Sequence, residues 1–200
     1  MLMHIYKYLM RIIYTHGANA SERSFAYIQQ SLEFDKIHYC NYNSHECSAH
    51  KNIARFINEL QDYEEDFFLV GHSLGGIYSL YILREFRDRV KGGITLSTPY
   101  NGSEIATWAR FMHPGDQLFA DITPQSSFIR DSRTIKINVP WTQVVSTAGD
   151  VKWLVGRNDG ICTHASMKSR SDMDHVEIDR NHYEIVQSQR VVDLIKSKLP

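Results

Sequence analysis

The sequence predicts an α/β fold with a mostly parallel central sheet and helices on both faces. Its strand-like runs are continuously apolar rather than alternating, which is typical of strands buried on both sides, and they lie at residues 12–14, 66–70 and 93–96. Segments with helical spacing of apolar residues separate them, at residues 22–32, 48–61 and 74–86. Parallel strands need such crossover helices, so this alternation favours a parallel sheet.

Further elements complete the predicted alternation. A strand over residues 36–40 precedes the helix at 48–61, and strands at 142–146 and 176–178 precede a closing helix over 183–198. Residues 1–13 are apolar enough to resemble a signal core, but charged residues interrupt them and no small-residue cleavage site follows. We therefore predict that they are early strand material.

Residues 99–140 break the alternation of strands and helices. They hold four of the five prolines, together with scattered aromatic residues such as Trp108, Phe111, Phe119 and Phe128. This composition predicts a small inserted cap. Two interpretations stay open: short helices that complete the core, or a cover over a site at the carboxyl ends of the strands, where α/β folds bind their ligands.

Length and composition limit which classes of protein this sequence can belong to. Two hundred residues with 42% hydrophobic composition predict a single domain over residues 1–200. A net charge of −1 gives no positive electrostatic field that would attract the phosphate backbone of a polynucleotide, so no nucleic-acid partner is expected. The sequence has no unbroken run of about 18 apolar residues, so we expect no integral membrane segment. Without an evident signal peptide, the expected location is cytoplasmic.

Cofactor and metal motifs are not evident. The three cysteines are too few for a disulfide framework and form no C-x-x-C pair. His45 and His50 lie five residues apart, whereas a zinc-binding helix needs histidines four apart. No phosphate-binding glycine motif occurs. We expect neither a cofactor nor a metal.

The segment Gly71-His72-Ser73-Leu74-Gly75 is the strongest signal for chemistry. An apolar run precedes it and a helical pattern follows it, which is the context of a nucleophile elbow. In such a turn the serine takes strained backbone angles, and the two glycines remove Cβ atoms that would collide. Ser73 is therefore the predicted nucleophile.

A serine nucleophile needs a base, and the base needs an acid that orients it. His182 follows the last predicted strand, where a loop could carry it over Ser73, so it is the predicted base. Asp150 and Asp159 both follow the strand at 142–146, and the residues alone leave both open as the acid. The predicted oxyanion donors are the backbone N–H groups of Leu74 and, after the first strand, Ala18.

Six segments together resemble the α/β-hydrolase superfamily, in particular small bacterial lipases and esterases. The first four are His16-Gly17, the turn around Ser73, residues 96–103 (Leu-Ser-Thr-Pro-Tyr-Asn-Gly-Ser) and residues 121–126 (Asp-Ile-Thr-Pro-Gln-Ser). The other two are Asn158-Asp159-Gly160-Ile161 and Asn181-His182-Tyr183-Glu184-Ile185. The resemblance implies a minimal α/β-hydrolase fold and assigns the acid to Asp159. Two departures are Ala18-Asn19-Ala20, where the family commonly has Gly-Gly, and Cys162, where small apolar residues are usual.

The expected function is hydrolysis of carboxylic esters through an acyl-enzyme on Ser73, with a small-molecule or lipid-like acyl ester as substrate. Two alternatives use the same fold. An acyltransferase or thioesterase would need the same three side chains, whereas a binding protein would keep the cleft without the chemistry. Protein partners and the acyl chain length are not predicted from the sequence.

Overall fold

Six parallel strands form one sheet in the order β2-β1-β3-β4-β5-β6, in a computed structural model that describes residues 9–200. The strands are β1 (Met10–Thr15), β2 (Ile37–Cys40), β3 (Asp66–His72), β4 (Val90–Leu96), β5 (Trp141–Ser146) and β6 (Asp174–Ile178). The sheet was predicted to be mostly parallel, and every pairing in it is parallel. Early strand material was predicted for residues 1–13: residues 10–13 belong to β1, and residues 1–8 lie outside the described residues.

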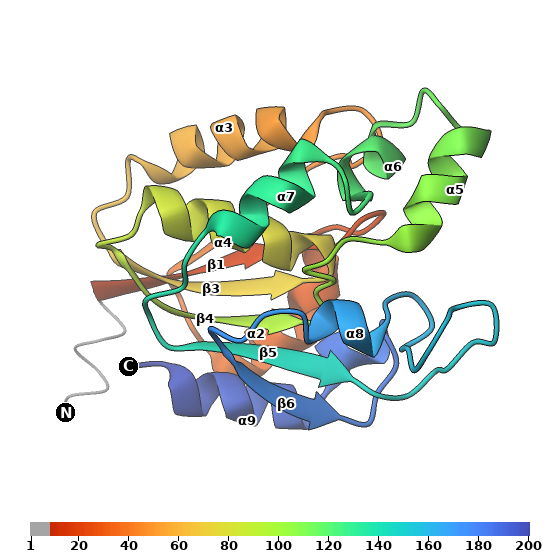
Figure 1. Ribbon diagram of the computed structural model, residues 1–200. Helices are drawn as coiled ribbons and strands as arrows, with labels where there is room; N and C mark the ends of the chain where they lie inside the picture. The colour runs from red at the N-terminus through yellow and green to blue at the C-terminus, as the bar shows by residue number, and fades with distance from the viewer. Residues whose placement is uncertain (1–8) are drawn as a thin grey trace.

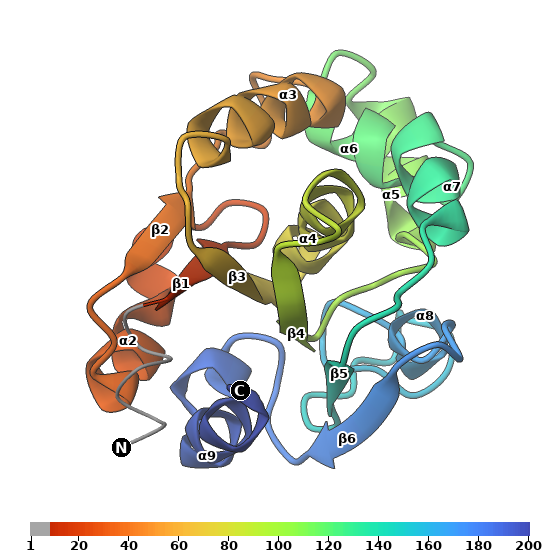
Figure 2. The same cartoon turned by 90° about the vertical axis from the view of Figure 1, so that its left-hand side faces the viewer.

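Helices cover both faces of the sheet, as predicted (Figures 1 and 2). One face carries α3 (Ala49–Leu60), α4 (Leu74–Glu85) and α7 (Ser127–Thr134), and the other carries α2 (Ala26–Leu32) and α9 (Gln189–Lys198). Successive residues of β3 point to opposite faces: Phe67 and Leu69 belong to the core under α3 and α4, whereas Phe68 and Val70 belong to the core with α2 and α9. Burial on both sides explains the continuous apolar runs.

Two predicted helices are interrupted. The segment at 22–32 is a 3₁₀ turn, η1 (Glu22–Phe25), followed by α2, and the closing segment is η2 (Glu184–Gln187) followed by α9. Ser188 separates η2 from α9 because its backbone is extended, with φ −87° and ψ 124°. Hydrophobic spacing persists across both breaks, so a pattern alone predicts one helix where the backbone forms two.

The insertion at 99–140 consists of α5 (Glu104–Met112), α6 (Gln117–Ile122) and α7. Phe128 of α7 is fully buried and stacks on Tyr81, so this part completes the core. By contrast, Trp108 and Phe111 on α5 are about four-fifths exposed, at 78% and 81%. The core interpretation therefore holds for α7 and not for α5.

The site elements meet at the carboxyl edge of the sheet. The loops after β1, β3, β4, β5 and β6 all leave from this edge, and a short helix, α8 (His164–Met167), lies beside β5. No helix between residues 9 and 200 is both long and apolar enough to cross a membrane.

Candidate active site

Ser73 lies in a strained turn between β3 and α4. Its backbone has φ 53° and ψ −123°, a conformation that costs a non-glycine residue about 1 to 3 kcal/mol. The turn is tight because neighbouring glycines leave no room for side chains: a Cβ on Gly75 would lie 1.9 Å from Thr15 O, and one on Gly76 would lie 1.9 Å from Thr98 Oγ1. The predicted strand, turn and helix around Ser73 are all present.

Ser97 shares the positive φ of Ser73 but not its surroundings. It follows β4 and also has φ 53°. Its side chain is fully buried, and its hydroxyl is 2.6 Å from the hydroxyl of Ser146. Ser73 instead lines an open pocket, so of these two serines only Ser73 is placed to meet a ligand.

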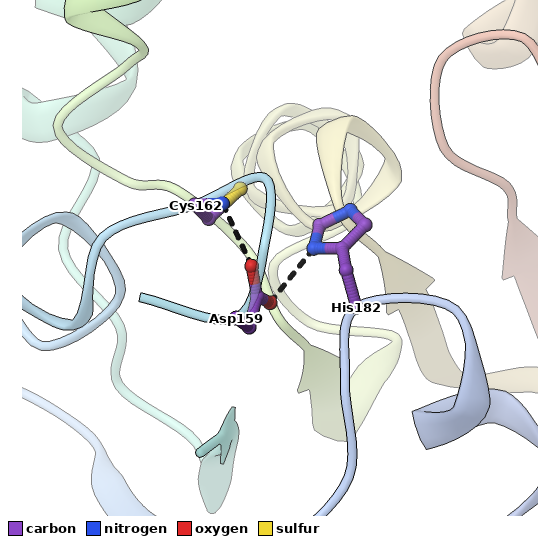
Figure 3. Close-up of side chains that lie close together, drawn as sticks. All are labelled: Asp159, Cys162 and His182. Atoms are coloured by element: carbon purple, nitrogen blue, oxygen red, sulfur yellow. Dashed lines mark hydrogen bonds and ion pairs between the residues drawn. The ribbon is translucent and has the colours of Figure 1, made fainter. Parts of the chain in front are cut away.

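His182 and Asp159 form a buried pair (Figure 3). Nδ1 of His182 donates a hydrogen bond of 2.8 Å to Oδ2 of Asp159, and the His182 backbone N–H donates to the Asp159 carbonyl at 3.1 Å. Both residues are at most 3% exposed. A proton held on Nδ1 leaves Nε2 of the neutral ring as an acceptor, which is the tautomer that a general base needs.

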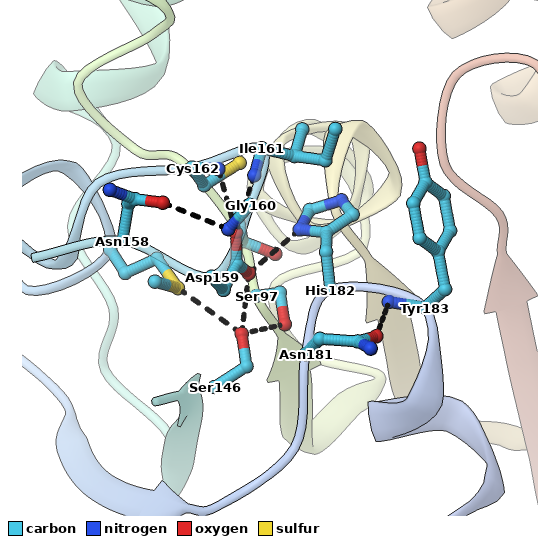
Figure 4. A network of polar contacts seen from close by, with 12 residues as sticks. Ser97, Ser146, Asn158, Asp159, Gly160, Ile161, Cys162, Asn181, His182 and Tyr183 are labelled. Carbon is cyan, nitrogen blue, oxygen red and sulfur yellow. Dashed lines mark hydrogen bonds and ion pairs between the residues drawn. The ribbon is translucent and has the colours of Figure 1, made fainter. Parts of the chain in front are cut away.

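The Asp159 carboxylate is held by several donors (Figure 4). Ser146 Oγ donates to Oδ2, and the backbone N–H groups of Ile161 and Cys162 donate to Oδ1 at 3.1 and 2.7 Å. Burial by itself would raise the pKa of Asp159. The hydrogen bond from His182 and its charge, together with the hydrogen bonds from Ser146 and Cys162, have the larger combined effect and lower the pKa below its usual value. The carboxylate is therefore ionised at neutral pH.

Asp150, the other candidate acid, has a different role. It is exposed, and its Oδ1 accepts a 2.6 Å hydrogen bond from the backbone N–H of Asn158. Asn158 in turn bonds the backbone of Val151, Gly156 and Gly160 through its side chain. Asp150 thus closes the loop that carries Asp159, whereas Asp159 is the carboxylate that contacts His182.

His72 joins the Ser73 turn to the His182 loop. Its Nε2 donates a hydrogen bond of 2.9 Å to the carbonyl of His182, and the two rings lie 5.0 Å apart. Complete burial, followed by the charge of neighbouring His182, lowers the pKa of His72 to about 3. A neutral His72 with its proton on Nε2 therefore fixes the backbone of His182.

The buried, neutral state of His72 predicts a pH-dependent stability. Its pKa is about 3 when folded and about 6.5 when unfolded, so its contribution is complete above pH 6.5 and is lost as the pH falls toward 3. The free energy of unfolding should drop by about 1 kcal/mol more between pH 7 and 5.5 in the native protein than in His72→Gln. Urea unfolding at the two pH values measures this, and equal drops would contradict a neutral buried His72.

The loop after β1 places a second set of backbone groups beside Ser73. A Cβ on Gly17 would lie 3.0 Å from the Ser73 Cβ, so the loop touches the serine directly. His16 braces this loop: its Nδ1 donates to the Gly17 carbonyl at 2.8 Å, and its ring stacks on Tyr42. Between residues 9 and 200, no acceptor pairs with the backbone N–H of Ala18 or of Leu74. Both donors remain available.

These groups surround a pocket of about 1070 Å³. Its lining includes Ser73, His72, His182 and Ala18, together with apolar side chains from three other segments: Leu118, Phe119 and Ile122 of α6, Ile161, and Val186. No hydrogen bond within the described chain joins the Ser73 hydroxyl to His182, a bond that often tightens only with substrate bound. Part of the insertion therefore does line the site, through α6.

Comparison with known proteins agrees with this architecture. Residues 49–142 match the family model described as the alpha/beta hydrolase fold. A lipase from Bacillus licheniformis in its mature form superposes with a TM-score of 0.73 at 16% identity, over 94% of this chain and 91% of the lipase. The chain has the α/β-hydrolase fold.

Two further structures share the α/β-hydrolase fold with this chain. A lipase-esterase related protein from Clostridium acetobutylicum has a TM-score of 0.65 at 11% identity, with 94% and 93% of the two chains covered. A pyrethroid hydrolase from Sphingobium faniae has a TM-score of 0.62 at 14% identity, with 94% and 96% covered. No curated protein sequence matches the chain.

Several residues of the site belong to no motif that the sequence analysis identified. Ser146 and Ser97 support Asp159 in a chain of hydroxyls, and Tyr42 supports His16 by stacking and by a 2.9 Å hydrogen bond to its carbonyl. Ser146 and Ser97 lie at or just after strand ends on the carboxyl edge. Polar residues closing an apolar strand run are the signal that could have found these two.

Proposed function

We propose that this chain is a serine hydrolase that cleaves carboxylic esters through an acyl-enzyme on Ser73. The observation that carries the proposal is the buried hydrogen bond between His182 Nδ1 and Asp159 Oδ2, next to the pocket that Ser73 lines. That bond fixes the tautomer in which Nε2 can accept a proton. The strained backbone of Ser73 also supports this role, because such strain concentrates at functional positions.

In the first half-reaction, Ser73 Oγ attacks the carbonyl carbon of the ester while His182 Nε2 takes the hydroxyl proton. Asp159 stabilises the resulting imidazolium without taking its proton. The imidazolium then protonates the leaving alkoxide, which departs as an alcohol and leaves an ester on Ser73. Water attacks that ester with His182 again as base, so the acid is released and Ser73 recovers its proton.

Negative charge on the carbonyl oxygen needs donors that are already in place. The unpaired N–H of Leu74 directly follows Ser73 at the start of α4, and the unpaired N–H of Ala18 lies on the loop that touches Ser73. Each such donor contributes about 3 to 4 kcal/mol to transition-state stabilisation. His16 and Tyr42 act as positioning residues because they hold the Ala18 loop.

The pocket favours an apolar acyl or alcohol group. Aliphatic and aromatic side chains of α6 line it near Ser73, and its volume of about 1070 Å³ exceeds what a short acetyl ester needs. Three of the similar structures are described as a lipase, a lipase-esterase related protein and a pyrethroid hydrolase. The first two descriptions fit ester cleavage by this chain.

Phe119→Ala tests this substrate class. Because Phe119 lines the pocket, the variant should lose about 10-fold in kcat/KM for p-nitrophenyl octanoate and little for p-nitrophenyl acetate. Trp108→Ala is the matched control, since Trp108 is 78% exposed and lies outside this pocket. Equal losses on both esters, or no ester hydrolysis by the native protein, would count against the proposed substrate.

A further inference from the structure

The thiol of Cys162 lies against the Asp159–His182 pair. One donor atom from each of the three residues, the Cys162 Sγ, an Asp159 carboxylate oxygen and a His182 ring nitrogen, lies within 4.8 Å of the other two. Figure 3 shows the sulfur on the side of Cys162 that faces the His182 ring. Cys162 is 5% exposed, and within residues 9–200 its thiol forms no hydrogen bond. A buried, unpartnered sulfur therefore lies within 4.8 Å of two further metal-ligating groups.

The donor set fits one class of cation. Sulfur, imidazole nitrogen and carboxylate oxygen together suit Zn²⁺, whereas Mg²⁺ and Ca²⁺ prefer sites made only of oxygen. Ligand atoms of tetrahedral Zn²⁺ lie roughly 3.3 to 3.8 Å apart, so movements of about 1 Å would bring these donors into place. The charges also balance, since one divalent cation neutralises a carboxylate and a thiolate in a buried site.

The cluster can be reached from two sides. Cys162 lines a second cavity of about 350 Å³ between α5, the loop at 153–155 and α8, and His182 lines the Ser73 pocket. Ile161 contributes to both cavities and is 39% exposed. Two of the three donor residues, Cys162 and His182, therefore line cavities through which a hydrated cation can approach.

We propose that Asp159, Cys162 and His182 form an inhibitory Zn²⁺ site. Zn²⁺ binds the sulfur, an Asp159 oxygen and His182 Nδ1, and the bound metal displaces the thiol proton to solvent. The proton on Nδ1 is displaced, and the neutral ring then carries its proton on Nε2. That is the atom that must accept the Ser73 proton, so the bound metal locks His182 in the unreactive tautomer. No oxidation or reduction takes place.

The inhibition rests on the proposed function, but the metal site does not. With metal-free protein, Zn²⁺ should inhibit ester hydrolysis reversibly, and EDTA should restore activity, whereas Mg²⁺ and Ca²⁺ should have no effect. Cys162→Ala should raise the inhibition constant for Zn²⁺ at least about 10-fold, because it removes one of the three ligands. Cys47→Ala is the matched control, because Cys47 is exposed and outside the cluster. Equal inhibition of the native protein and Cys162→Ala would overturn the proposal.

Cobalt gives a readout that does not need activity. Co²⁺ bound to a thiolate shows a sulfur-to-metal charge-transfer band in the near ultraviolet, so the native protein and Cys47→Ala should show the band on titration with Co²⁺. Cys162→Ala should lack it, and so should Cys162→Ser, which tests the site if the alanine variant folds poorly. A band without ester hydrolysis would refute the proposed function and keep the metal site, whereas hydrolysis without a band would refute the metal site alone.

Discussion

Ser73→Ala should lower kcat for ester hydrolysis by at least about 10⁴-fold, and His182→Ala should lower it by a similar factor. The reason is that the two side chains act as one unit, so losing either member removes the activated nucleophile. The double variant should consequently lose little more than either single variant. Steady-state kinetics with p-nitrophenyl esters measure all three, and a double variant with multiplied losses would contradict a shared step.

The same position carries a prediction on stability. Ser73 has φ 53° and ψ −123°, which glycine adopts with little strain. Ser73→Gly should therefore raise the free energy of unfolding by about 1 kcal/mol while it removes activity. Ser73→Ala keeps the strained backbone and should leave stability nearly unchanged, so it serves as the control in urea unfolding. A Ser73→Gly variant less stable than Ser73→Ala would show that the turn is not strained.

Asp159→Asn should lower kcat by about 10³-fold to 10⁴-fold, whereas Asp150→Asn should change it by less than about 3-fold. Asparagine at 159 removes the ionised acceptor for His182 Nδ1–H, so the ring no longer has a fixed tautomer. At 150 the same change only weakens a hydrogen bond to the backbone of Asn158. Both variants replace one oxygen by one nitrogen, which makes them a matched pair for kinetics.

The opposite ranking would assign the acid to Asp150. If both variants lose activity, a stability measurement would show whether Asp150→Asn is still folded. This matters because Asp150 helps to close the loop that carries Asp159. If Asp150→Asn is both fully folded and inactive, the assignment of Asp159 is wrong. A folded, active Asp159→Asn would lead to the same conclusion.

The strands could be predicted because burial on both faces leaves a direct mark on the sequence. Phe67 to Val70 are continuously apolar since alternate side chains enter the two cores on either side of β3. The turn at Ser73 could be predicted because its glycines are needed where backbones nearly touch. These signals come from neighbouring residues, so they can be recognised in the sequence before the fold is known.

The surroundings of the acid could not be predicted because they depend on contacts between distant segments. Ser97 and Ser146 lie 49 residues apart and meet only because β4 and β5 are neighbours in the sheet. The choice between Asp150 and Asp159 likewise depended on which carboxylate the fold turns toward His182. The family resemblance favoured Asp159, whereas residue spacing did not distinguish the two.

The insertion shows a different limit. Trp108, Phe119 and Phe128 are all aromatic residues at helical positions, yet one is exposed, one lines the pocket and one is buried. Apolar spacing reports that a helix has an apolar face, but it does not report what that face contacts. The packing of α5, α6 and α7 against the sheet decides this, and it is set by the whole chain.

Covalent labelling with a fluorophosphonate probe, followed by peptide mapping, tests the central claim most directly. The probe reacts with an activated serine, so the account predicts one adduct on Ser73 that is lost in Ser73→Ala and strongly reduced in His182→Ala. Ser97 is the informative comparison because it has the same φ but is fully buried. An adduct on another residue, or a folded native protein that takes no label, would contradict the assignment of Ser73 as nucleophile.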